Sequence, residues 1–262
     1  MGRSKLENDM SEALLVDRAA SVVKLTLNRP EKHNALDVPT MCDVAEVIER
    51  LAEDRAIRVL VLTGAGGRSF CSGADLSGVG DQWPWDDDPL SRLSNALEHF
   101  PGATVCALNG SVYGGGTDVA MACDFRIGQT GQRMFIPPAR FGIHYQISGL
   151  RRAVGRIGLG PAKRLYLAGE TFDASEMKRV GFLDHLVEPA EFDAFVAGYV
   201  AEIAGMAPLA VRGMKSVLNA VARGDLDEEK ALLGVHACID SEDFKEGQRA
   251  IAERRKPVFQ GR

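Results

Sequence analysis

The chain has 262 residues, of which 45% are hydrophobic, so it can form one large domain or a domain with an appendage. Its net charge of -5 argues against a nucleic-acid-binding protein, because such proteins usually present a basic face. No run of about 18 apolar residues is present, so no membrane span is expected. Residues 1–12 are polar and are predicted to be a disordered terminus rather than a signal peptide.

The cysteines and histidines indicate neither a disulfide framework nor a metal centre. The five cysteines are widely spaced and form no CxxC pair, which is typical of a reduced, cytoplasmic protein with buried thiols. The five histidines show no HxxxH or HExxH pairing, so no metal site is predicted.

Regular elements alternate along the first part of the chain. Residues 13–17 and 22–27 are typical of two short strands, and Asp37 is placed to cap a helix whose apolar residues recur at helical spacing. Two buried strands follow at 58–63 and 104–108, and each runs into a glycine-rich turn. Repeated strand–turn–helix units of this kind predict a layered α/β domain.

Helices dominate the later part of the chain. The α/β core is predicted over residues 13–195, with Asp173 as a helix cap. Residues 196–262 are predicted to be a helical region with a break at Pro208. No linker separates the two parts, so the helical region is expected to pack on the core or on another subunit.

Residues 79–89 interrupt this pattern. They hold both tryptophans, Trp83 and Trp85, together with two prolines and an acidic run. This composition favours a long loop, either a mobile lid or a plain surface loop.

The turn GAGG after the strand at 58–63 invites comparison with a dinucleotide-binding loop. Residues 64–69 lack the third glycine of that fingerprint and open no obvious helix. The chain also has no GxxxxGK[ST] phosphate loop and no GxSxG nucleophile turn. Nucleotide binding at this turn is therefore not expected.

A second glycine-rich segment, residues 109–124, carries more information. Three consecutive glycines (114–116) precede a helix-compatible run, so free N–H groups at the positive end of a helix can face a ligand. The small residues Ser72, Gly73 and Ala74 leave a second stretch of backbone approachable. Two amides from two loops can share one carbonyl oxygen, which is the geometry of oxyanion stabilisation. A tight turn without a ligand is the alternative.

These motifs resemble those of the enoyl-CoA hydratase/isomerase, or crotonase, superfamily. The resemblance covers nearly the whole chain and includes, in order, LNRPEKHNAL, RVLVLTGAGGRSFCSGADL, CALNGSVYGGGTDVAMACDFRI and DSEDFKEGQRAIAERRKPVF. It implies a spiral of β-β-α units whose C-terminal helical region packs homotrimers, often paired into hexamers. It also implies a coenzyme A thioester as substrate, with no separate cofactor, and chemistry through a thioester enolate.

The same resemblance assigns binding roles to individual residues. The backbone N–H groups of Ala74 and Gly115 are expected to form the oxyanion hole. The residues expected to contact coenzyme A are Lys32, Ala35, Leu36, Ser72, Asp75, Leu76 and Arg254. Arg254 can make this contact from a neighbouring subunit.

The acid–base residues depart from the pattern of well-known hydratases, which use two glutamates. Asp118 stands at the first position, so a carboxylate is kept with one methylene less reach. Ala139 stands at the second position and cannot carry a proton. We predict catalysis centred on Asp118, with a helix N-terminal acid that only stabilises the dipole as the alternative.

The stretch FGIHYQISGLRRAVG is shorter than in typical hydratases and resembles the equivalent loop of methylmalonyl-CoA decarboxylases. Tyr145 is the second candidate catalytic residue, because it can donate a hydrogen bond to a carboxylate or protonate an enolate. His144 can titrate near neutral pH. Ordinary packing of the tyrosine and an exposed histidine are the alternatives.

The leading hypothesis is an acyl-CoA enzyme of enoyl-CoA hydratase/isomerase type with a non-standard acid–base set. Two alternatives stay open: an acyl-CoA decarboxylase that uses the same oxyanion hole with Tyr145, and a protein that binds acyl-CoA without catalysis. Acyl chain length is not predicted.

Overall fold

The computed structural model describes residues 12–75 and 88–262. The predicted disordered terminus therefore lies outside the described residues except for its last position. The loop with Trp83 and Trp85 and the expected coenzyme A contact Leu76 also lie outside them. Cys71, Cys106 and Cys123 are buried, as expected of thiols that pack as small apolar groups.

The described strands form two sheets. The six-stranded sheet has the order β1 (Leu14–Ala19), β2 (Val22–Leu27), β3 (Val59–Gly64), β5 (Ala103–Ala107), β7 (Phe125–Gln129) and β10 (His185–Val187). The four-stranded sheet has the order β4 (Ser69–Cys71), β6 (Ser111–Tyr113), β8 (Arg133–Phe135) and β9 (Thr171–Asp173). All pairs are parallel except β1 with β2 and β8 with β9. From β3 to β8 the chain thus winds as a spiral that adds strands alternately to the two sheets.

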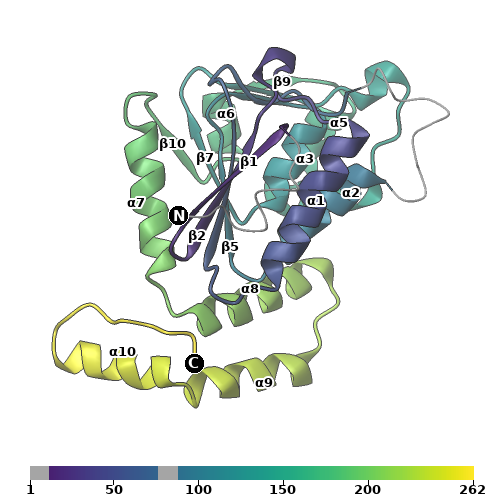
Figure 1. Ribbon diagram of the computed structural model, residues 1–262. Coiled ribbons are helices and arrows are strands. Elements are labelled where there is room, and N and C mark those ends of the chain that lie inside the picture. The colour runs from purple at the N-terminus through teal and green to yellow at the C-terminus, as the bar shows by residue number, and fades with distance from the viewer. Residues whose placement is uncertain (1–11, 76–87) are drawn as a thin grey trace.

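Helices connect and cover these strands (Figure 1). The described helices are α1 (Val38–Ala52), α2 (Pro89–His99), α3 (Gly115–Ala122), α4 (Ile147–Ile157), α5 (Leu159–Tyr166), α6 (Ala174–Arg179), α7 (Phe192–Ala204), α8 (Pro208–Arg223), α9 (Glu228–Ile239) and α10 (Glu242–Ala252). Two short 3-10 helices, η1 (Pro30–Lys32) and η4 (Pro138–Phe141), lie in the connections. The prediction of a layered α/β fold built from repeated strand and helix units is confirmed by this architecture.

The predicted helix starts are confirmed. The Asp37 side chain accepts a hydrogen bond from the Thr40 amide at the beginning of α1. Asp173 caps α6 in the same way, by accepting from the Glu176 amide. Pro208 is the first residue of α8, where its missing N–H is not needed.

The central strand β3 is buried on both faces, and its alternation divides the apolar interior in two. Leu60 and Leu62 belong to the large cluster that includes α1 and α2, whereas Val59 and Val61 belong to a smaller cluster that includes α7. In Figure 1, α7 accordingly lies across the large sheet from α1 and α2. Because side chains alternate along a strand, a continuous apolar run such as this one marks a strand covered on both sides.

The predicted boundary between the α/β core and the helical C-terminal region lies within a helix. The expected division at residue 195 falls inside α7, which packs against β3, β5 and β7 and therefore belongs with the core. The helices α8, α9 and α10 lie below the two sheets in Figure 1. Among the described residues no single helix is long and apolar enough to cross a membrane. The bent pair α7 and α8 meets that test of length and composition only when taken together.

Asn34 ties the loop before α1 to the strand that leads toward the site. Its Nδ2 donates to the carbonyl oxygens of Ala65, at 3.0 Å, and Ser69, at 2.9 Å. Its Oδ1 accepts from the Arg29 amide at 3.0 Å, and its φ of 57° lies in the left-handed region that asparagine tolerates. The Asn34 side chain is 1% exposed, so these bonds are made away from water.

We expect Asn34→Ala to lower the free energy of unfolding by about 2–4 kcal/mol, because two carbonyl groups lose a donor and the αL backbone is strained. Urea denaturation followed by circular dichroism measures the change. The control is Asn28→Ala, which removes one exposed bond to the Glu12 carbonyl and should cost less than about 1 kcal/mol. Equal losses in the two variants would contradict this role for Asn34.

Candidate active site

The site begins at the ends of two neighbouring strands. β4 and β6 pair in parallel, so the loops that follow them emerge at the same edge of the small sheet. The first loop carries Ala74, and the second carries Gly115. Backbone hydrogen bonds hold both in place: Leu36 pairs with Ala74 as an isolated parallel bridge, and the Gly114 amide donates to the Phe135 carbonyl at 2.8 Å.

Two glycines let the loops approach each other. Gly73 has a φ of 94°, and a Cβ there would lie 2.8 Å from the Tyr113 oxygen and 2.9 Å from the Gly115 nitrogen. Gly114 has a φ of 50° and a ψ of -127°, outside the regions open to L side chains. Glycine is therefore required by conformation and by space at Gly73, and by conformation at Gly114.

The amides of Ala74 and Gly115 are free to bind a ligand. No described residue accepts a hydrogen bond from either N–H. Gly115 is the first residue of α3, where backbone N–H groups lack intrahelical partners and the helix dipole is positive. The structure thus brings together the two groups named from the sequence. Their role as an oxyanion hole stays a prediction.

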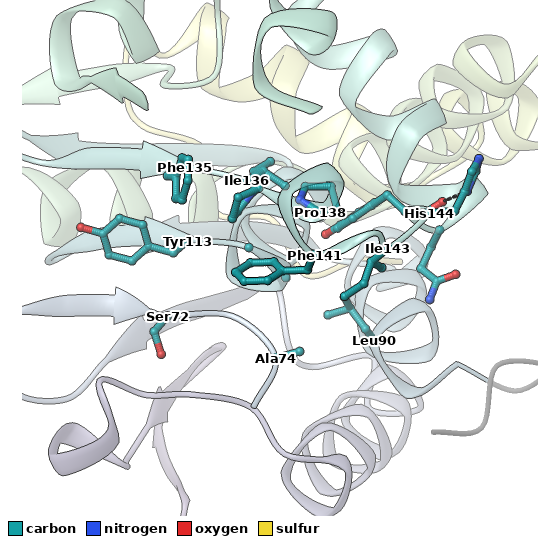
Figure 2. A pocket seen from close by; sticks show the side chains of 15 residues that line it. Ser72, Ala74, Leu90, Tyr113, Phe135, Ile136, Pro138, Phe141, Ile143 and His144 are labelled. Carbon is teal, nitrogen blue, oxygen red and sulfur yellow. Dashed lines mark hydrogen bonds between the residues drawn. The ribbon is translucent and has the colours of Figure 1, made fainter. Parts of the chain in front are cut away.

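A cavity of about 330 Å³ opens in front of these amides. Figure 2 shows Ser72 and Ala74 on one side, with Phe141 and Ile143 across from them. The lining residues are mostly apolar and comprise Ser72, Ala74, Leu90, Tyr113, Gly114, Gly115, Phe135, Ile136, Pro137, Pro138, Phe141, Ile143, His144, Tyr145 and Gln146.

Asp118 does not line this cavity, and its carboxylate has no exposed surface. One oxygen accepts from Arg152 Nη1 at 2.6 Å, and the other accepts from the Ser94 hydroxyl at 2.8 Å. Arg152 in turn bonds to Glu98 and to Asn95, both at 2.9 Å. Both carboxylate oxygens are thus used within a network that joins α2, α3 and α4.

The electrostatics of this pair follow from its burial. Burial raises the pKa of the Asp118 carboxyl, and the Arg152 guanidinium and the Ser94 hydroxyl oppose that rise. Burial also lowers the pKa of Arg152, but the carboxylates of Asp118 and Glu98 outweigh it and raise that pKa above its ordinary value. A proton leaving or reaching Asp118 would disturb an ion pair that is closed to water.

Tyr145 lines the cavity, but its hydroxyl oxygen is buried and has no hydrogen-bond partner among the described residues. The ring packs edge-on against Tyr166, with 4.9 Å between ring centroids. It also stands beside Gly149: a Cβ there would lie 2.6 Å from Tyr145 Cε1 and 3.1 Å from Asp118 Oδ1. Burial raises the pKa of Tyr145 well above its usual range. The structure therefore brings Tyr145 to the cavity through its ring and not through its hydroxyl.

The other two positions considered for proton transfer are Ala139 and His144. Ala139 lies exposed in η4 next to Pro138, and it is not among the lining residues. His144 is exposed at the cavity, where its Nδ1 lies 2.8 Å from the Tyr145 carbonyl oxygen (Figure 2). No aspartate or glutamate is present among the described lining residues.

Most of the expected coenzyme A contacts that the structure describes lie in two loops that meet beside the cavity, and Arg254 lies elsewhere. Ser72 lines the cavity, and its hydroxyl donates to the Lys32 carbonyl at 3.4 Å. Ala35 and Leu36 continue the same loop, which meets Asp75 through a bond from the Asp75 amide to the Leu36 carbonyl. The Leu36 side chain is buried, so only its backbone can face a ligand.

Arg254 stands apart from the others. It follows α10, and α10 lies away from α2 and α3, whose N-terminal residues border the cavity (Figure 1). Within one chain the structure does not bring Arg254 to the site.

Sequence reasoning did not find the apolar lining or the partner of Asp118. Leu90, Phe135 and Phe141 are ordinary apolar residues in the sequence, and only the fold reveals that they share a cavity. Arg152 lies 34 residues from Asp118, and no spacing rule links the two. Among the described residues, no group of three or more His, Cys, Asp or Glu side chains could hold a metal ion.

Comparison with known proteins agrees with this architecture. The family model described as enoyl-CoA hydratase/isomerase matches residues 17–262. The (E)-benzylidenesuccinyl-CoA hydratase of Thauera aromatica is 34% identical over 92% of this chain and 96% of its own length. The short-chain-enoyl-CoA hydratase of Clostridium acetobutylicum is 30% identical over 93% of this chain and 95% of its own length.

Solved structures give the same result. An enoyl-CoA hydratase from Bacillus anthracis has a TM-score of 0.87 at 28% identity and covers 95% of this chain and 100% of its own. An enoyl-CoA hydratase/carnithine racemase from Magnetospirillum magneticum has a TM-score of 0.89 at 27% identity and covers 96% of this chain and 97% of its own. This chain therefore belongs to the enoyl-CoA hydratase/isomerase family, the crotonase superfamily, and is an enzyme of that family.

Proposed function

We propose that this enzyme binds an acyl-CoA thioester and stabilises its enolate with the backbone amides of Ala74 and Gly115. The observation that carries the proposal is the pair of free amides at the cavity wall, one of them at the start of α3. Donors fixed in this way act on the developing oxygen charge without reorganising, and one such donor contributes about 10²–10³ in rate. The relatives from Thauera and Clostridium are both named as hydratases of CoA thioesters, which supports the same substrate class.

We infer a positioning role for Asp118 in the arrangement described. Its carboxylate would have to leave Arg152 and Ser94 before it could accept a proton from a substrate. The Tyr145 hydroxyl would likewise have to turn out of its buried position. Proton transfer by Asp118 and Tyr145 is thus the alternative that requires movement. In the position they occupy, Asp118 anchors α4 and Tyr145 presents its ring to the ligand.

Two reactions and simple binding remain to be separated by assay. Loss of enoyl absorbance with crotonyl-CoA would assign hydration. Release of CO₂ from methylmalonyl-CoA would assign decarboxylation, which needs no carboxylate base at the cavity. Tight acyl-CoA binding without either reaction would favour a binding protein, and absence of binding would overturn the proposal.

We also propose that α8, α9 and α10 pack against further copies of this chain, as a homotrimer or a pair of trimers. No residue of α9 is buried in the single chain, although Leu232 is 55% exposed and Leu233 69% exposed. Ile251 in α10 is 80% exposed. Apolar surface gathered in this way marks a contact surface in soluble proteins. Arg254 follows the same segment, so assembly would bring it toward a neighbouring copy.

The remaining parts of the proposal concern surroundings and cofactors. Five free cysteines accord with a reducing compartment, and we propose a cytoplasmic location. We propose no separate cofactor, because the thioester of the substrate supplies the electrophilic carbonyl.

The positioning role of Asp118 predicts that Asp118→Asn lowers the free energy of unfolding by about 3 kcal/mol, because the charge of Arg152 loses its buried counterion. Chemical denaturation measures the change. Glu98→Gln, which alters a partner of Arg152 with a 19% exposed side chain, is the control and should have a smaller effect. A stable Asp118→Asn protein whose rate falls by about 10²–10⁴ would instead show proton transfer.

The oxyanion hole predicts the effect of Gly115→Ala. The new Cβ would lie 3.0 Å and 3.2 Å from the Leu90 methyl carbons and 3.4 Å from the Ala74 nitrogen, and so crowd the thioester oxygen. We expect acyl-CoA binding to weaken about tenfold or more, while free coenzyme A, which has no thioester, is bound as before. Titration calorimetry measures both ligands. Gly155→Ala in α4, where a Cβ meets nothing within 4 Å, is the matched control. Equal weakening of both ligands would remove support for the hole.

The proposed assembly predicts that light scattering after gel filtration gives three or six times the mass of one chain. Leu233→Asp should shift the protein toward smaller species, because a charge at a buried apolar contact loses its hydration. Leu15→Asp, at a 46% exposed position of β1, should leave the mass unchanged. A monomeric wild-type protein would contradict the assembly.

A further inference from the structure

We infer that the cavity selects an uncharged acyl group with a flat aromatic ring next to the thioester. This inference rests on the proposed function, since it assumes that the thioester oxygen meets the amides of Ala74 and Gly115. It adds the chemical class of the acyl group, which follows from what surrounds those amides.

Aromatic side chains are concentrated at this cavity. Four of its 15 lining residues are aromatic, namely Tyr113, Phe135, Phe141 and Tyr145, whereas aromatic residues make up 6% of the chain. Rings prefer offset-stacked or edge-to-face neighbours, and such a pair adds about 0.5–1.5 kcal/mol beyond its buried area. A wall of this composition therefore favours a ring over a flexible chain.

Two of these residues, Tyr113 and Phe135, are paired on strands β6 and β8, and their backbone adjoins the turn at Gly114. Tyr113 precedes Gly114, and the Phe135 carbonyl accepts from the Gly114 amide at 2.8 Å. The Arg140 guanidinium lies over the Phe135 ring, 5.0 Å from its centroid, and donates to the Gly169 carbonyl at 3.0 Å. Phe135 is therefore held against Arg140, so its ring is in place before a ligand arrives.

The other two rings present apolar faces. Phe141 is 61% exposed and, in Figure 2, projects between Tyr113 and Ile143 on the side opposite Ala74. An aromatic side chain exposed at a cavity gains free energy when a ligand covers it. Tyr145 also lines the cavity, while its hydroxyl is buried away from water. A ligand would thus meet the ring of Tyr145 and not its polar end.

The lack of lysine and arginine among the described lining residues disfavours a carboxylate on the acyl group. The described lining residues include no lysine or arginine, and His144 is the only histidine among them. A carboxylate moved from water into such a cavity loses hydration, and the described lining residues offer it no lysine or arginine as a partner. An acyl group that carries a carboxylate is therefore expected to bind more weakly, which also counts against methylmalonyl-CoA as the substrate.

Calorimetric titration of the full chain with three thioesters tests this inference. Cinnamoyl-CoA carries a flat ring, nonanoyl-CoA has the same number of acyl carbons in a flexible chain, and 4-carboxycinnamoyl-CoA adds a charge. We expect cinnamoyl-CoA to bind about fivefold more tightly than nonanoyl-CoA and more than about tenfold more tightly than the carboxylated ligand. Phe141→Leu should reduce the first ratio toward one. Phe244→Leu, at a 47% exposed position of α10, should not.

The outcomes separate this inference from the proposed function. If none of the three thioesters binds, the proposed function fails. If all three bind with equal affinity, or if the carboxylated ligand binds best, acyl-CoA binding stands and the aromatic selectivity is wrong. Since the three ligands are compared on the wild-type protein, this test does not depend on the folding of either variant.

Discussion

The close approach of two backbone segments is the constraint on which the site depends. The loop after β4 and the turn after β6 meet so tightly that a Cβ at Gly73 would lie 2.9 Å from the Gly115 nitrogen. Parallel pairing of β4 with β6 places both segments at one sheet edge, and the Phe135 carbonyl holds the turn by its bond from Gly114. The placement of the two free amides is therefore a property of how the two strands end.

The buried ion pair of Asp118 and Arg152 is the second constraint. It joins α3 to α4, and through Ser94, Asn95 and Glu98 it also joins α2. Burying two charges costs free energy unless each is well paired and hydrogen-bonded. Here the described residues provide hydrogen-bond partners for both carboxylate oxygens and for all three guanidinium nitrogens. Because α4 begins at Ile147, directly after the segment with His144, Tyr145 and Gln146, fixing α4 also fixes one wall of the cavity.

Much of the fold and the backbone part of the site could be predicted from the sequence, because both are encoded locally. Apolar runs define the strands, Asp37 and Asp173 cap their helices, and the glycines mark the turn. The role of Asp118 could not be predicted in this way. Its position in α3 is local, but its burial and its bond to Arg152 are set by the packing of α3 on α4. The cavity wall was hidden for the same reason, since Leu90, Phe135 and Phe141 come from three separate elements. The boundary expected at residue 195 falls inside α7, whose packing on the sheet a change in composition does not reveal.

The two donors proposed for the thioester oxygen are main-chain groups, which a side-chain substitution does not remove. No codon specifies an amide, so substitutions around Ala74 and Gly115 can alter the wall while leaving the two donors in place, provided that the glycines which set the backbone path are kept. Under the proposed function, binding of the thioester and the choice of reaction would therefore be able to change separately. Ala139 and the enclosed Asp118 differ from the two-glutamate pattern, whereas Gly115 stands at the start of α3 with its amide free. New activities can arise here by exchange of wall residues, without rebuilding the part of the molecule that holds the substrate.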